Sequence, residues 1–155
     1  MAEFKPAHIS VSTEMTLDHP AGDIWPLLCP VREYDWIETW ECEVLHSVSG
    51  YIEPGCVFRT DFPGEEPETW LTCRHDPMER IEFVRTGKTR IIHFILELEP
   101  LGDRTGMTWT HHVTALNEKG NDYVKGKPEA FAVQARMLEK MLAHYLKTGE
   151  MLKIG

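Results

Sequence analysis

The chain has 155 residues, of which 42% are hydrophobic and 26% charged, and its formal net charge is −9. This length and composition favour one globular domain over residues 1–155 and exclude a fibrous or disordered chain. The negative charge repels phosphate backbones and anionic lipid, so we expect neither a nucleic-acid partner nor membrane insertion.

The four cysteines are spaced without a Cys-x-x-Cys pair or a zinc-binding pattern. Residues 1–7 lack the apolar core of a signal peptide. No apolar run approaches the roughly 20 residues that span a bilayer. We therefore expect a reduced, cytoplasmic protein, a monomer or homodimer, with no metal and no other cofactor.

A strand is predicted for residues 9–17, because apolar and polar side chains alternate there with a period of two. His19-Pro20 ends this strand, and a short helix follows that carries Ile24, Leu27 and Leu28 and stops at Pro30. Residues 31–40 predict a second short helix or turn, rich in aromatic side chains that close the core or rim a pocket.

Six more strands are predicted at residues 41–48, 56–62, 68–75, 80–85, 89–99 and 106–115. Turns containing glycine or proline separate them, and Gly87-Lys88 is typical of a tight hairpin. Because the strands follow one another closely along the chain, we expect an antiparallel sheet.

A polar loop is predicted at residues 117–127, and Pro128 then begins a long helix that ends near residue 151, with Gly149 as its C-cap. At 100° per residue, one arc of this helix is largely apolar. The arc consists of Phe131, Gln134, Ala135, Leu138, Met141, Leu142 and Tyr145.

The order of elements predicts an α+β fold in which a curved, seven-stranded antiparallel sheet wraps around the long C-terminal helix. One helix cannot cover a flat sheet of seven strands, so the sheet must curl and the two short helices must close an open end. Curling beyond the girth of one helix leaves room for a cavity between helix and sheet.

The sequence resembles the START/polyketide-cyclase (SRPBCC) superfamily over about residues 6–150. The resemblance rests on the first strand, the stretch from His19 to Leu28, Trp36, the Gly-Tyr-Ile-Glu-Pro-Gly hairpin at 50–55, and the last helix. His19 departs from the pattern, since the family usually has alanine there. The resemblance implies a helix-grip fold, which hosts lipid carriers, hormone receptors, cyclases, hydroxylase domains and chaperone activators.

Matching apolar faces across the last hairpin sets its register. Residues Ile92, Phe94, Leu96 and Leu98 then lie opposite Val113, His111, Trp109 and Met107. Ile81 and Phe83 join this inward face, and Arg85 and Arg90 lie near its rim. The same register brings Glu82, His93 and His112 together on the opposite face, as polar surface residues or as zinc ligands.

The leading hypothesis is a protein that binds a small, largely apolar molecule, such as a lipid. The expected ligand-binding residues are Trp36, Phe83, Phe94, Trp109, His111, Gln134, Met137, Met141 and Tyr145, with Arg90 as a further polar contact. A cyclase, aromatase or dehydratase is the first alternative, with His111 as acid or base and Tyr145 or Arg90 polarising a carbonyl. The second alternative is an interaction module like the chaperone activators.

Overall fold

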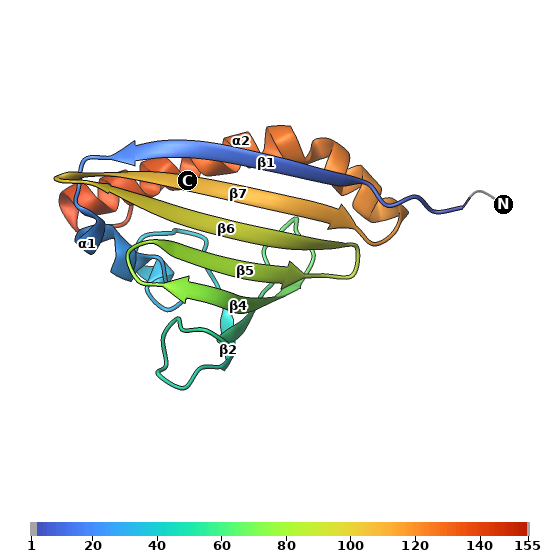
Figure 1. Cartoon of the computed structure of the whole chain (residues 1–155), viewed down its shortest axis with the longest axis horizontal. Helices are drawn as coiled ribbons and strands as arrows, with labels where there is room; N and C mark the ends of the chain where they lie inside the picture. The colour runs from blue at the N-terminus through green and yellow to red at the C-terminus, as the bar shows by residue number, and fades with distance from the viewer. Residues whose placement is uncertain (1–2, 155) are drawn as a thin grey trace.

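The structure is a computed structural model that describes residues 3–154. Seven antiparallel strands form one curved sheet in the order β1-β7-β6-β5-β4-β3-β2, so that β1 and β2 are its edges (Figure 1). The strands are β1 (His8–Leu17), β2 (Glu43–His46), β3 (Val57–Thr60), β4 (Glu68–Asp76), β5 (Arg80–Thr86), β6 (Arg90–Leu101) and β7 (Arg104–Ala115). The predicted α+β fold with a seven-stranded sheet is confirmed.

Short helical turns fill the segment between β1 and β2. They are α1 (Ala21–Ile24), the 3-10 turn η1 (Trp25–Leu27) and the 3-10 turn η2 (Glu33–Asp35). Two indole N–H groups fix this segment: Trp36 donates to the Leu27 carbonyl at 2.9 Å, and Trp40 donates to the Pro30 carbonyl at 2.8 Å. Both rings are buried, so the segment presents aromatic surface to the core.

The long helix α2 (Glu118–Thr148) begins ten residues before the predicted start. The loop expected at 117–127 is wrong, because Asn117 forms an N-cap in which its side-chain oxygen accepts from the Gly120 N–H at 3.0 Å. Pro128 lies inside the helix rather than at its first turn. The C-cap is as predicted: Gly149 has a φ of 74° and donates to the Tyr145 carbonyl at 2.7 Å.

The first turn of α2 requires glycine at position 120, because the backbone of Thr89 lies very close to it. A Cβ at this position would lie 2.0 Å from the Thr89 carbonyl oxygen. The first turn of α2 therefore sits against the hairpin between β5 and β6, at a distance that only glycine permits.

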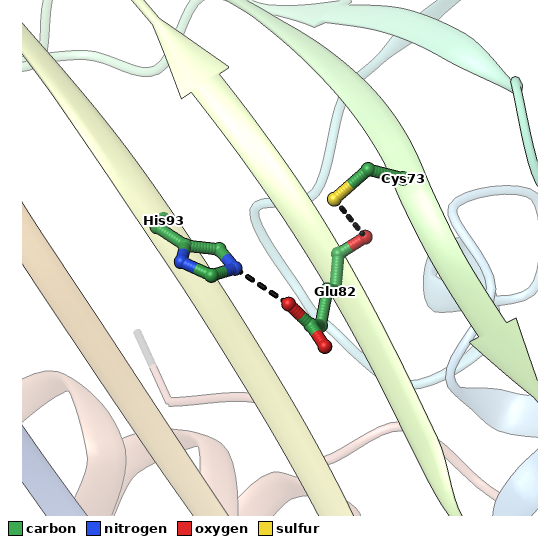
Figure 2. A group of neighbouring side chains, drawn as sticks. All are labelled: Cys73, Glu82 and His93. Atoms are coloured by element: carbon green, nitrogen blue, oxygen red, sulfur yellow. Dashed lines mark hydrogen bonds and ion pairs between the residues drawn. The ribbon is translucent and has the colours of Figure 1, made fainter.

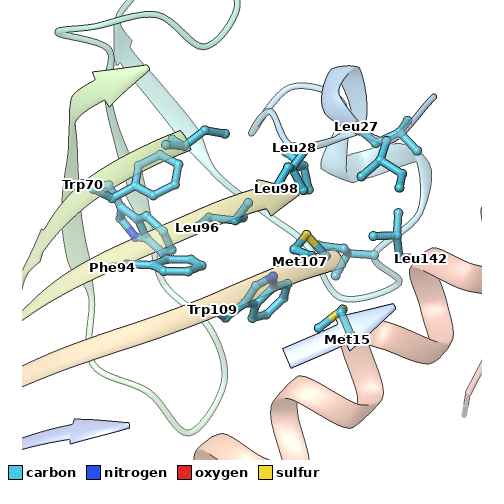
Figure 3. Close-up of a cluster of buried hydrophobic side chains, with 14 of the residues drawn as sticks. Met15, Leu27, Leu28, Trp70, Phe94, Leu96, Leu98, Met107, Trp109 and Leu142 are labelled. Atoms are coloured by element: carbon cyan, nitrogen blue, oxygen red, sulfur yellow. The ribbon is translucent and has the colours of Figure 1, made fainter. Parts of the chain in front are cut away.

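Helix α2 packs on β1 and β7 and leaves the rest of the concave face to other contacts (Figure 1). Strand side chains from β4, β6 and β7 point towards α2 and the segment after β1 (Figure 3). The predicted register is confirmed, with Phe94 opposite His111 and Leu96 opposite Trp109. Among residues 3–154, no helix combines the length and apolar character needed to cross a membrane.

Candidate ligand-binding cavity

A cavity of about 690 Å³ lies between the concave face of the sheet, α2 and the segment that contains η2. Its apolar lining consists of Leu28, Trp36, Ile37, Trp40, Phe58, Phe62, Trp70, Ile81, Phe83, Phe94, Leu96, Trp109, Ala130, Val133, Met137, Leu138 and Met141. Its polar lining consists of Glu33, Thr39, Glu65, Arg85, His111, Glu129 and Gln134. The volume lies within the range of about 300–1,000 Å³ that is typical of small-molecule sites.

An aromatic wall runs across the strands at the base of the cavity. Phe58 stacks on Trp70 with ring centroids 5.0 Å apart, and Trp70 meets Phe83 edge-on at 5.4 Å. Phe94 continues the wall, 5.6 Å from Phe83 and 5.8 Å from Trp109. Each of the strands β3 to β7 contributes an aromatic residue at an inward-facing position, so the wall follows directly from the register.

Most of the ligand-binding residues expected from sequence line the cavity. The structure places Trp36, Phe83, Phe94, Trp109, His111, Gln134, Met137 and Met141 in its wall. Tyr145 is half-buried near Arg32 and Leu146 and does not line the cavity.

Arg90, which was expected near the rim of the inward face, also lies outside the cavity wall. It is buried rather than at a rim, and it pairs with Glu65, Glu66 and Glu68. Its guanidinium carbon lies 3.8 Å from the centre of the Tyr123 ring. The charge of Arg90 is thus paired with acids of the protein. Arg90 is also absent from the cavity wall that contains His111, where the enzyme alternative required it.

Arg85, which the sequence placed near the rim, is the buried cation that does line the cavity. It pairs with Glu68 on the neighbouring strand through both Nε and Nη2, with the Nε bond at 3.1 Å. Its guanidinium also stacks over Trp70, 4.1 Å from the ring centre. The alternation of β5 signalled its inward direction, since Arg85 follows Phe83 by two residues.

His111 lies on the cavity wall between Phe94 and Phe131, with ring centroids 4.6 Å and 4.9 Å away. Its Nδ1 has no hydrogen-bond partner among the residues that the structure describes. Burial first, and then the positive charges of Lys127 and Arg85, lower the pKa of His111 well below its usual value. The ring is therefore neutral at pH 7 and offers one donor and one acceptor.

Two further polar groups of the wall were not singled out from sequence. The Trp109 indole N–H is buried and has no partner within residues 3–154. Glu33 is half-buried, and desolvation raises the pKa of its carboxyl group to about 8. No sequence signal marks Glu33, because it lies in a turn without periodicity.

The convex face of the sheet carries the polar cluster that the register predicted. The His93 Nε2 lies 2.6 Å from the Glu82 carboxylate, and the His93 and His112 rings are 5.7 Å apart (Figure 2 shows His93 and Glu82 with Cys73). Cys73, Glu82 and His93 could present three ligand atoms to a metal ion. However, Arg80 and Arg74 already pair with Glu82, which favours a surface ion-pair network.

No protein-family model matches the sequence, and no curated protein sequence matches it either. Solved structures share its fold. DynU16, a protein of the dynemicin biosynthetic locus, matches with a TM-score of 0.65 and 17% identity over 91% of this chain. This chain spans 48% of DynU16. Mll3558 from Rhizobium loti matches with a TM-score of 0.63 and 19% identity, over 91% of this chain and 99% of that one.

Norcoclaurine synthase from Thalictrum flavum, solved with dopamine and hydroxybenzaldehyde, matches with a TM-score of 0.65 and 14% identity. The match covers 90% of this chain and 89% of that one. These neighbours are SRPBCC/polyketide cyclase-like helix-grip proteins. The chain therefore has the helix-grip fold that the sequence resemblance predicted, and identities this low establish the fold alone.

Proposed function

We propose that this protein binds a small, largely apolar molecule in the cavity between the sheet and α2. The observation that carries this proposal is the cavity itself, about 690 Å³ in volume and lined mostly by aromatic and aliphatic side chains. An interior normally packs to the density of an organic crystal, so a space of this size is not a packing defect.

The unpartnered polar atoms of the wall support the same proposal. A buried donor or acceptor left without a partner costs about 1–3 kcal/mol. Two such atoms, Trp109 Nε1 and His111 Nδ1, lie two residues apart on β7 and both residues line the cavity. A bound molecule with a matching polar group would relieve this cost.

One structural neighbour offers a parallel, since norcoclaurine synthase was solved with the aromatic molecules dopamine and hydroxybenzaldehyde. The aromatic wall described above suits planar, aromatic ligands by stacking and edge-on contacts. We therefore expect an aromatic ligand rather than a saturated lipid chain.

Two alanine-to-tryptophan variants on α2 test the proposal. Both alanines are exposed on the same helix, but Ala130 lines the cavity and Ala143 does not. We expect the neutral fluorophore N-phenyl-1-naphthylamine to bind the wild type and A143W with one-to-one stoichiometry and to raise Tm. A130W should bind at least tenfold more weakly while retaining the same circular dichroism spectrum. Absence of binding to the wild type, or equal binding by all three proteins, would contradict the proposal.

An enzyme of the cyclase or dehydratase type is a second candidate, because Glu33 and His111 place two titratable groups in one apolar cavity. A carboxyl group with a pKa of about 8 can act as a general acid near neutral pH. The test is mass spectrometry of a bound ligand after incubation. A change in its mass with the wild type but not with Glu33→Gln supports catalysis, and recovery of unchanged ligand from both proteins favours a carrier.

A further inference from the structure

Among residues 3–154, Glu33 is the partly buried acid of the cavity wall that has no cation partner. Glu65 pairs with Arg90, and Glu68 behind the wall pairs with Arg85 and Arg90. No hydrogen bond or ion pair to the Glu33 carboxyl is present within residues 3–154. Glu129 also lines the cavity, but it is exposed.

Glu33 is therefore the partly buried carboxyl group of the wall that no cation of the described residues compensates. Arg85 is balanced by Glu68, and His111 is neutral because its pKa is lowered. Burial raises the pKa of the Glu33 carboxyl group, and no cation or hydrogen-bond donor of residues 3–154 lies against it to oppose that rise. A cation placed within about 4–6 Å would restore the carboxylate and gain an ion pair in a poorly hydrated site.

Two aromatic residues of the segment that carries Glu33 also line the cavity and suit the same cation. Trp36 and Trp40 line the cavity, and both have their indole N–H groups engaged by backbone carbonyls. What they present to a ligand is therefore ring surface, which attracts an ammonium group through the π-electrons.

Near Trp109 and His111, the cavity instead needs a hydrogen-bond acceptor from the ligand. The indole N–H is a donor only, so a ligand must bring an acceptor such as a hydroxyl or carbonyl oxygen. His111 packs against Phe131 in the N-terminal half of α2, whereas Arg32, next to Glu33, lies near Tyr145 towards its C-terminal end. The cation site and the acceptor site thus mark different ends of the cavity.

We propose that the cavity takes an aromatic amine, with its ammonium group against Glu33 and an oxygen at the far end of its ring system accepting from Trp109. This inference rests on the proposed binding function and names the ligand class of that site. It predicts selectivity by charge among molecules of one shape.

Three probes with one skeleton test the inference: 2-(6-hydroxynaphthalen-2-yl)ethylamine, the corresponding ethanol, and (6-hydroxynaphthalen-2-yl)acetate. By calorimetry at pH 7, we expect the amine to bind the wild type at least tenfold more tightly than the alcohol, and the acetate most weakly. Glu33→Gln should abolish the preference for the amine and leave the affinity for the alcohol unchanged. Glu41→Gln, which removes an exposed charge outside the cavity, should keep the preference.

Other outcomes separate this inference from the broader proposal. Equal affinity of the wild type for amine and alcohol overturns the inference and leaves the binding function standing. A preference that survives in Glu33→Gln, or that is lost in Glu129→Gln instead, also overturns it. If neither these probes nor N-phenyl-1-naphthylamine bind the wild type, the proposed function fails as well.

Discussion

The two faces of the sheet treat their polar side chains differently, and the neighbouring residues His111 and His112 on β7 show the contrast. On the convex face, His112 Nδ1 lies 2.7 Å from the Ser10 hydroxyl, and His93 beside it pairs with Glu82. On the concave face, His111 Nδ1 has no partner among residues 3–154. The convex-face histidines have partners within the protein, whereas under the proposed function a ligand would provide the partner of His111.

This difference separates structural polar groups from binding groups. Exposed ion pairs contribute about 0–1 kcal/mol each, so the convex network adds little to stability. Buried polar atoms without partners reduce stability, so the two on the cavity wall support the proposed ligand binding. The predictions below test this distinction, from the largest expected effect to the smallest.

Removing the buried acid of the concave face should have the largest effect. Glu68→Gln leaves Arg85 and Arg90 without their shared carboxylate, and breaking a buried pair costs about 3–5 kcal/mol. The matched change on the convex face, Glu97→Gln, removes an exposed partner of Arg80 and should cost under about 1 kcal/mol. Urea unfolding of both variants measures the difference, and equal losses would remove the contrast between the faces.

The pH dependence of the free energy of unfolding should reveal the raised pKa of the Glu33 carboxyl group. Its pKa is about 8 in the folded protein against 4.5 for the ordinary group, so the folded state holds a proton that the unfolded state releases. Relative to Glu33→Gln, the wild type should therefore lose stability as pH rises from 4.5 through about 8. Urea unfolding at pH 5, 7 and 9 checks this, and parallel curves for the two proteins would show that the carboxyl group is hydrated.

His111→Phe should change stability by about 1 kcal/mol or less at pH 7, and in the stabilising direction, because it removes an unpartnered polar atom. Burial holds the folded-state pKa of His111 below the ordinary histidine value of 6.5, so its stability contribution is complete above that pH. As pH falls below 6.5, the wild type should lose stability relative to the variant. A loss of several kcal/mol at pH 7 would show that His111 has a structural partner.

His93→Gln on the convex face should have the smallest effect. The His93 side chain is 41% exposed, so its bond to Glu82 contributes less than about 1 kcal/mol. Zinc added at micromolar concentration should leave the Tm of the wild type unchanged, since arginines already occupy Glu82. A rise in Tm with zinc that His93→Gln abolishes would instead identify a metal site here.

The sheet could be predicted from sequence because each strand repeats its pattern. Phe94 and Leu96 alternate against His111 and Trp109, and this alternation fixes both register and facing. The start of α2 could not be predicted, because Gly120, Gly126 and Pro128 disfavour a helix locally. The start of α2 is set instead by the side-chain cap of Asn117 and by the close approach of Gly120 to Thr89.

The part of the site that lies on strands could be predicted from sequence, whereas the part that lies in turns and loops could not. Aromatic residues on alternating positions were found, whereas Glu33 was not, since a turn has no period from which its direction follows. Arg90 and Arg85 occupy similar inward positions, yet only Arg85 lines the cavity. What separates them is the acidic segment around Glu65, whose position depends on how a loop folds back over Arg90.

The indole N–H resonance of Trp109 tests the central claim most directly. Trp36, Trp40 and Trp70 already donate to protein oxygens, and Trp25 lies outside the cavity against His75. On titration with 2-(6-hydroxynaphthalen-2-yl)ethanol, we predict that the Trp109 proton, assigned with Trp109→Phe, moves downfield as it gains an acceptor, while Trp25 stays in place. A Trp109 resonance that does not move at saturation, or a shift of equal size at Trp25, would contradict the account.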